Sequence, residues 1–456
     1  MRLPLPLHTY RPQSSARLLN WYAEATPVEA KAPIQLIRCP GVATAAAPAI
    51  GAGRGLFNFK ETLYSVTGTS LISTNSAGAS TTLGIILGIS RVTFAANATQ
   101  LAICADDNVY VWDGSAITQV QTGISTIDGV DGYIVGAKSD QSGQFVCSDL
   151  QDALTWNPLN FATAEGSSDP LIGLIVDHRE VLLGGTRTIE PWYNAGDVGF
   201  PFARSPSTGV IELGLAAGQS FAKQDNSSFW LASDLTVRRL SGAVPARVSH
   251  HGVEQSIRSY ADVTTAYAFS YAWNGHLFYT LTFPGVATWE FDATTGEWHE
   301  RASEGSAYWQ VTGAAECYQR VYVQRTSDGM LGYLSSDTCA EFDGTYRTDD
   351  IETGNIYKDT KRICFDSIEL RYQTKKQQTG DQASPSVTLY KSVDGGGNFA
   401  IAGLSASVSL GLIGEKPRVM WARLGSSREM AFRFRFSSAN PTVIEDASMS
   451  VTLCRS

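Results

Sequence analysis

Residues 100–114 read Gln-Leu-Ala-Ile-Cys-Ala-Asp-Asp-Asn-Val-Tyr-Val-Trp-Asp-Gly, and they indicate the fold class. Two runs of apolar, β-branched and aromatic residues flank the turn signal Asp106-Asp107-Asn108, and Asp113-Gly114 closes the second run. Such runs, bounded by Asp, Asn and Gly, are typical of strands, and Asp-Gly tolerates the positive φ of tight hairpins. The stretch therefore predicts a β-hairpin.

The same pattern recurs along the middle of the chain. Each unit joins a strand, a turn with Asp or Asn, and a second strand that ends in an aromatic residue. The units begin near Leu56, Val92, Ile127, Leu174, Ser220, Ala266 and Thr312. Their spacing of roughly 35 to 47 residues is close to the ~40–45 residues of a propeller blade. We expect an all-β fold whose body, residues 54–350, is a β-propeller of six or seven short blades, some of them incomplete.

Different patterns flank this body. Residues 351–456 contain strand-like runs, and Phe432-Arg433-Phe434-Arg435-Phe436 alternates strictly, so one face of that strand is aromatic and the other basic. This region is expected to be a C-terminal β-sandwich. Residues 1–53 are expected to be an extended N-terminal arm and docking segment with a short helix over 14–23, since Ser14 or Ser15 could cap its first turn. The prolines near the start disfavour a central strand, so we expect this segment to lie on a neighbouring molecule.

Composition narrows the class of protein. The 456 residues are 43% hydrophobic and 17% charged, which indicates a packed chain. No apolar run approaches the ~20 residues of a spanning helix, and the first residues lack a signal-peptide pattern. We therefore expect no membrane insertion and a protein that acts where it is made.

Charge is sorted along the chain. The net charge is −9, but residues 1–55 and 351–456 each carry +4, which leaves −17 on residues 56–350. One interpretation is that these charges are solvated faces without a partner. The other is that the basic ends contact acidic surfaces while the acidic body faces something that it must not bind.

Motifs for catalysis and metal binding are weak. The seven cysteines are scattered singly, which predicts reduced, mostly buried thiols rather than a disulfide framework or a zinc site. His250-His251 would point to opposite faces of a strand, so a loop or interface role is favoured over a shared metal. The sequence contains no P-loop, G-x-S-x-G or H-E-x-x-H motif. We expect no enzyme activity, no cofactor and no metal.

Several blocks, in order, resemble one family. They are Ser14–Glu24 followed by Cys39-Pro40-Gly41, Asp152–Glu165, Gly185–Asn194, Phe229-Trp230-Leu231 and His250–Glu254, where His250-His251 replaces a Ser-Thr pair. The order and spacing of these blocks are similar to those of the packaged-DNA stabilisation proteins of short-tailed bacteriophages (podoviruses), which form the tail hub, or nozzle, at the head-tail connector.

This resemblance implies a structural virion protein. It implies a homohexameric ring below the portal and adaptor that closes the head, retains packaged DNA and forms part of the DNA ejection channel. The implied partners are copies of the chain itself, the adaptor and portal complex, tail spike, fibre or needle proteins, and double-stranded DNA in transient contact. The implied location is the phage tail at the head-to-tail interface, after assembly in the host cytoplasm. The family provides no catalytic residues to transfer.

Specific residues follow from the matched blocks. The interface candidates are Arg11, Arg17, Asn20, Trp21, Tyr22, Arg38, Trp156, Glu190, Trp192 and Tyr193. Arg2, Arg11, Arg17 and Arg38 are the candidates for docking onto an acidic adaptor surface. In a ring, the acidic middle would be concentrated around an axis, where it would repel duplex DNA and let it slide.

One alternative comes from a different class. Ser392–Phe399 approximates the Asp-box turn of sialidases and other propellers, in which Ser and Asp brace a hairpin and do no catalysis. A glycan-binding or glycan-degrading (sialidase-like) propeller of the phage tail is therefore the second hypothesis. A single box, outside the expected propeller, favours it less.

Overall fold

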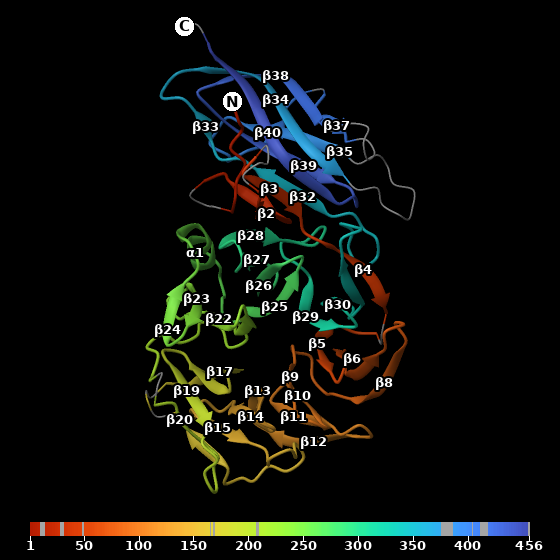
Figure 1. Ribbon diagram of the computed structural model, residues 1–456, viewed down its shortest axis with the longest axis vertical. Helices are drawn as coiled ribbons and strands as arrows, with labels where there is room; N and C mark the ends of the chain where they lie inside the picture. Colours follow the sequence, from red (N-terminus) through yellow and green to blue (C-terminus); the bar gives the residue numbers. More distant parts are fainter. Residues whose placement is uncertain are drawn as a thin grey trace.

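The computed structural model describes residues 1–9, 14–27, 32–47, 50–164, 166, 169–206, 209–374, 386–403, 405–410 and 418–454. These residues form two lobes, a propeller and a β-sandwich that lies beside its rim (Figure 1). The described residues contain no candidate membrane-spanning helix.

Seven four-stranded blades make up the propeller, which confirms the all-β propeller prediction. Blade 1 is β5 (Gly53–Phe59), β6 (Thr62–Thr67), β7 (Ser70–Thr74) and β8 (Ser80–Ile85); blade 2 is β9 (Thr93–Ala96), β10 (Leu101–Ala105), β11 (Asn108–Trp112) and β12 (Ile117–Thr122). Blade 3 is β13 (Ile124–Val130), β14 (Tyr133–Lys138), β15 (Gln144–Cys147) and β16 (Phe161–Thr163); blade 4 is β17 (Leu171–Asp177), β18 (Glu180–Gly185), β19 (Ile189–Asn194) and β20 (Phe202–Arg204). Blade 5 is β21 (Ala222–Gln224), β22 (Ser227–Leu231), β23 (Val237–Ser241) and β24 (Val244–Arg247); blade 6 is β25 (Tyr267–Trp273), β26 (His276–Phe283), β27 (Ala287–Asp292) and β28 (Glu297–Arg301).

Blade 7 takes its outermost strand from the N-terminal region. β29 (Val311–Cys317), β30 (Arg320–Arg325) and β31 (Leu331–Ser335) are completed by β4 (Gly41–Ala46), with Leu334 opposite Val42. The expected boundary between residues 53 and 54 therefore does not separate the arm from the propeller, because β4 closes the ring.

The second lobe is a sandwich of two antiparallel layers. One sheet has the order β2 (Trp21–Ala25), β3 (Ile34–Arg38), β40 (Thr442–Leu453), β34 (Ile363–Thr374) and β38 (Arg418–Ser427). The other has β1 (Arg17–Leu19), β32 (Thr348–Glu352), β39 (Glu429–Ser437), β35 (Ser386–Ser392) and β36 (Ala400–Ile401), with β33 (Ile356–Tyr357) and β37 (Ser407–Ser409) paired to it. Phe432, Phe434 and Phe436 are fully buried between the layers, as their alternation predicted.

One sheet runs through both lobes. β1 lies parallel to β28 of blade 6, with Leu19 opposite Glu300, and antiparallel to β32 of the sandwich. Blade 6 and the second layer of the sandwich are thus a single hydrogen-bonded sheet.

The helix expected over residues 14–23 is wrong. Those residues form β1 and β2, because β1 fills the gap between β28 and β32 and its pairing on both edges overrides the weak local helix preference. Asn20, at φ 62°, turns the chain from one strand into the next. The single helix in the described parts of the chain is α1 (His251–Arg258), and His250 is its N-cap, accepting a hydrogen bond from the Gly252 amide.

The first residues lie on their own chain, which corrects the expected placement on a neighbour. The Leu3 amide donates to the carbonyl of Ala447 in β40, and the Leu3 side chain is buried in the sandwich core. His8 then reaches Glu297 of blade 6 at 2.6 Å. The segment follows this route because Leu3 is part of the sandwich core and Leu5 packs against the same core in the same molecule.

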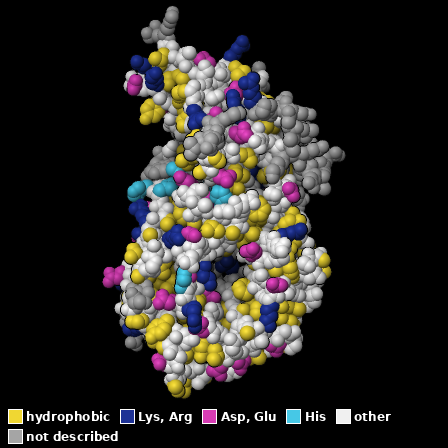
Figure 2. All heavy atoms as spheres, in the orientation of Figure 1, with side chains coloured by type: hydrophobic (Ala, Val, Ile, Leu, Met, Phe, Trp, Pro, Cys, Tyr) yellow, Lys and Arg dark blue, Asp and Glu magenta, His cyan; other side chains and the backbone are white. Residues whose placement is uncertain are grey.

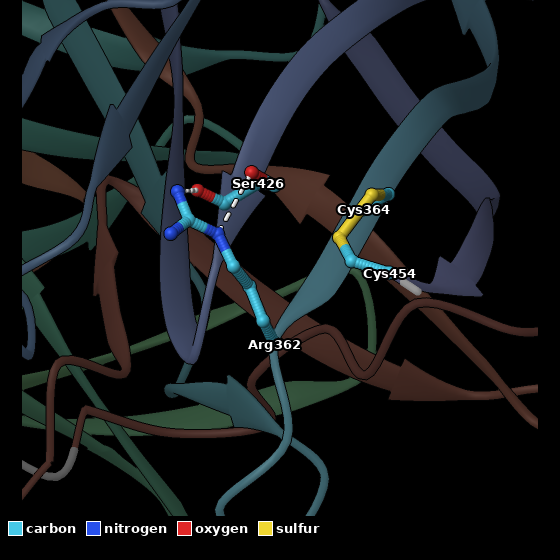
Figure 3. Close-up of a disulfide and its surroundings, with 4 residues drawn as sticks. All are labelled: Arg362, Cys364, Ser426 and Cys454. Carbon is cyan, nitrogen blue, oxygen red and sulfur yellow. Dashed lines mark hydrogen bonds between the residues drawn. A yellow bond between two sulfur atoms is a disulfide. The ribbon is translucent and has the colours of Figure 1, made fainter. Parts of the chain in front are cut away.

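The cysteine prediction holds in part. Cys364 and Cys454 form a disulfide, whereas Cys39, Cys104, Cys147, Cys317 and Cys339 are buried free thiols. The bridge joins the start of β34 to the residue after β40 (Figure 3). The Cys454 amide donates to the carbonyl of Arg362. The spacing of the cysteines in the sequence does not indicate this disulfide, because Cys364 and Cys454 meet only when β34 and β40 pair.

Candidate functional site at the junction of propeller and sandwich

Asn20 lies at the turn from β1 to β2, where the N-terminal segment passes between the propeller and the sandwich. Its Nδ2 donates to the carbonyl of Ala302 at 3.1 Å and to Asp349 Oδ1 at 2.9 Å, while its Oδ1 accepts from the Ala302 amide. Its side chain is fully buried. Asparagine suits this corner because it tolerates positive φ and can satisfy several backbone groups at once.

Asp349 is the charged centre of the junction. It lies on β32, is fully buried, and accepts from Arg38 Nε at 2.7 Å and from Arg347 Nε at 2.7 Å. Both arginines also donate to backbone carbonyls, Arg38 to Asn440 and Arg347 to Cys39. Burial alone would lower the pKa of Arg347, but the negative charge of Asp349 outweighs this effect, so the pKa of Arg347 is raised.

A row of charges continues along the same strands. Arg17 on β1 makes a bidentate pair with Glu300 and lies 3.8 Å from buried Glu352. On the other side of β32, Arg433 donates to Glu352 and Arg435 to Asp350. Acidic β32 therefore lies between two basic strands, and much of the charge of the basic ends is neutralised within the chain.

A second buried network lies on blade 6. Glu290 and His299 face each other on β27 and β28, with Glu290 Oε2 2.9 Å from His299 Nε2. Arg301 donates to Tyr271 Oη at 2.6 Å and lies 3.5 Å from Glu290, and Cys39 Sγ lies 3.6 Å from His299. Burial alone would raise the pKa of Glu290 and lower the pKa of His299. Arg301 and His299 nevertheless lower the pKa of Glu290 to about 2. Cys39 and Glu290 raise the pKa of His299 to about 10.

These side chains also form the one group in the described residues with the spacing of a metal site, Cys39, Glu290 and His299. The group fits a metal poorly. A metal-bound histidine must offer an unprotonated nitrogen, whereas His299 holds its proton beside Glu290, and the Arg301 guanidinium already contributes a second positive charge. We interpret the group as an ion-pair network.

The interface candidates from the N-terminal block that the structure describes converge on this junction. Trp21 and Tyr22 are buried, and Trp21 packs against Phe436 with ring centroids 4.9 Å apart. Arg17 and Arg38 are engaged with carboxylates of this chain, and Arg2 pairs with Asp446. Arg11 lies outside the described residues. Contact of these side chains with an adaptor stays a prediction.

The candidates from the other blocks lie on blades 3 and 4. Glu190 is buried and accepts from Trp192 Nε1 at 2.9 Å and from Arg204 at 2.6 Å, so it braces the edge of blade 4. Trp156 is half-buried and donates to the carbonyl of Ala153. Tyr193 is 38% exposed and is the one member of this set that presents a large apolar surface outward.

The propeller axis contains a cavity of about 380 Å³. All seven innermost strands or the residues just before them line it, and its charged lining residues are Arg91, Lys223 and Asp128. Figure 2 shows Lys and Arg side chains at a hollow near the centre of the propeller.

Sequence reasoning missed the acidic half of the junction. Glu290, Glu300 and Asp349 were assigned to the acidic body and Glu352 to the basic C-terminal region, although each pairs with a basic residue of this chain. The available signal was the run Thr348-Asp349-Asp350-Ile351-Glu352, which places acidic residues opposite the alternating arginines of β39. The prediction of an Asp-box turn is confirmed, since Ser392 Oγ accepts a hydrogen bond from the Gly396 amide and Asp394 Oδ1 accepts one from the Asn398 amide.

Comparison with known proteins adds a family assignment. A model of the phage stabilisation family, described as "Bacteriophage P22 Gp10, beta-propeller", matches residues 14–339, which include β1 to β4 and all seven blades. No curated protein matches the chain. Among solved structures, the WD40 β-propeller domain of Doa1 is similar with a TM-score of 0.43 and 10% identity, over 65% of this chain and 97% of that one.

Proposed function

Because this chain belongs to the phage stabilisation family of the P22 Gp10 β-propeller, we propose that it forms a homohexameric ring below the portal and adaptor. In this proposal the ring closes the head after packaging, retains the DNA and forms part of the ejection channel. The family match over residues 14–339 carries the proposal.

The junction between the lobes supports a structural role. A ring that retains packaged DNA would need its two lobes held in a fixed relative position. Here the lobes share a sheet, and the buried network around Asp349 joins β3 to β32 and reaches the propeller through Asn20, which donates to Asp349 and to the carbonyl of Ala302 after β28. The charged pair that crosses between the lobes is Arg17 with Glu300, and separating the lobes would leave both half-buried charges without their partner.

The surface charge supports transit of DNA without adhesion. Among the described residues of the propeller, the exposed acidic side chains outnumber the exposed basic ones. The exposed acidic residues are Glu61, Asp106, Asp107, Asp113, Asp140, Asp197, Glu212, Asp234, Asp262, Glu304, Glu316, Asp328, Asp337 and Asp343, and the exposed basic residues are Lys60, Arg179, Arg187, Arg204, Lys223, Arg247, Arg258 and Arg320. Acidic side chains turned toward the channel would repel phosphates, so duplex DNA would slide past them.

Cryo-electron microscopy of the assembled particle tests the proposal. We expect density for the two-lobed subunit in six copies directly below the portal and adaptor. Absence of the chain from the particle, or a position at the outer tip of a tail appendage, would contradict the proposal, and the second position would favour the glycan-binding alternative. Particles assembled with Asp349→Ala should leak DNA, whereas Asp328→Ala, on the exposed propeller surface, should not.

A further inference from the structure

The axial cavity of the propeller holds an arginine without a carboxylate partner. Arg91 lies at the entry to blade 2 and reaches across the axis toward blades 5, 6 and 7. Its Nε donates to the carbonyl of Thr312 at 2.9 Å, Nη1 to Gln219 Oε1 at 3.4 Å, and Nη2 to the carbonyl of Ala268 at 3.3 Å. No Asp or Glu of the described chain lies within ion-pair distance of it.

We propose that this cavity is a binding site for a small oxyanion, a carboxylate or phosphate group, and that Arg91 is the residue that holds it. A guanidinium has five N–H groups, and the three contacts above leave one on each Nη without an acceptor among the described residues. Two N–H groups are the number that a carboxylate or phosphate accepts in a bidentate pair. This inference is independent of the proposed ring.

Other arginines of the chain show how unusual this arrangement is. Arg54, also on the inner side of the propeller, donates to the carbonyls of Ser90, Gly68 and Ile86 and pairs with Asp106. Arg17 and Arg347 are likewise matched by carboxylates. Arg91 is half-buried in the cavity wall, and a guanidinium there with only neutral acceptors marks a place for an anion.

The shape of the cavity suits a small ligand. A volume of about 380 Å³ lies at the lower end of the range for small-molecule sites and is too small for duplex DNA. Arg91 lies at the end where the innermost strands begin. Exposed Lys223 lies further along these strands, at the mouth, and pairs with Asp128 at 3.7 Å, so Arg91 supplies the net positive charge of the lining. The aromatic rings of Phe57, Phe94 and Phe221 line the wall between and can contact an apolar ligand body.

Thermal unfolding of the full chain with inorganic phosphate or with acetate, at ionic strength held constant with chloride, tests the site. We expect a saturable rise in Tm with at least one of the two anions, and a dissociation constant at least tenfold weaker in Arg91→Gln. Arg179→Gln is the matched control, because it removes the same charge from an exposed ion pair with Asp131 outside the cavity. A response to phosphate alone, or to acetate alone, names the class of oxyanion.

Two results would overturn the proposal, namely no saturable response of the wild type to either anion, or the same response in Arg91→Gln as in the wild type. If Arg91→Gln fails to fold, a crystal of the wild type grown with selenate decides the question. Anomalous signal within hydrogen-bond distance of the Arg91 guanidinium supports the site, and its absence there contradicts it. Lys223→Gln, at the exposed mouth, should weaken binding about threefold without affecting folding.

Discussion

Arg17 and Glu300 form a bidentate ion pair across the strands that join the two lobes, with Arg17 Nε 3.0 Å from Glu300 Oε1 and Nη2 2.6 Å from Oε2. Arg17 lies on β1 and Glu300 on β28, next to the parallel pairing of Leu19 with Glu300. The pair therefore fixes the edge at which the propeller ends and the sandwich begins.

Replacing Arg17 with alanine should destabilise this edge. The change leaves Glu300, a half-buried carboxylate, without its bidentate partner, and hydrogen bonds to charged groups contribute about 1.5–3 kcal/mol. We expect a loss of about 2 kcal/mol in the free energy of unfolding, measured by urea denaturation. Arg320→Ala, at an exposed site, is the control, and an equal loss in both variants would contradict the assignment.

Asp349→Ala should cost more. The variant leaves Arg38 and Arg347 buried without their carboxylate, and removal of one member of a buried ion network costs about 3–5 kcal/mol. Denaturant unfolding monitored by tryptophan fluorescence would measure this loss. Asp328→Ala removes an exposed carboxylate and should change stability by less than about 1 kcal/mol.

Alkaline pH should weaken blade 6 through His299. Its pKa is raised to about 10 in the folded chain, against about 6.5 when unfolded, because Cys39 and Glu290 outweigh the effect of burial. The folded state therefore binds the proton more tightly. This contribution is complete below pH 6.5 and is lost as pH rises toward 10, at up to about 1.4 kcal/mol per pH unit.

Unfolding free energies of the wild type and of His299→Gln across this pH range provide the measurement. The wild type should lose stability more steeply than the variant between pH 7 and pH 10. Parallel curves would show that His299 is not protonated beside Glu290.

Reduction of Cys364–Cys454 should destabilise the sandwich and leave the propeller unchanged. The bridge closes a long loop, for which the chain-entropy model gives at most about 4–5 kcal/mol, but β34 and β40 already pair along their length. We expect a loss of about 2 kcal/mol in Cys364→Ser, seen as faster proteolysis of the sandwich. Intact-mass analysis of the wild type before and after alkylation verifies the bridge, and full alkylation without reduction would refute it.

Local patterns in the sequence were sufficient for the strands and the blade repeat. Period-two alternation and turn residues act over a few positions, so the hairpin at 100–114, the alternation of residues 432–436 and the Asp-box turn all form as expected. The helix prediction over residues 14–23 is wrong for the converse reason. Its strands exist only because β28, β32 and β3 supply their partners.

The sequence shows which regions carry acidic and basic residues, but only the tertiary structure shows which of these residues form ion pairs. Arg17 finds Glu300 at a separation of 283 residues, and Arg38 finds Asp349 at 311. No local pattern records such distances, because each partner is brought in by ring closure and by the sheet shared between the lobes. The same closure leaves Arg91 on the propeller axis without a carboxylate, since its neighbours there are backbone carbonyls and an amide.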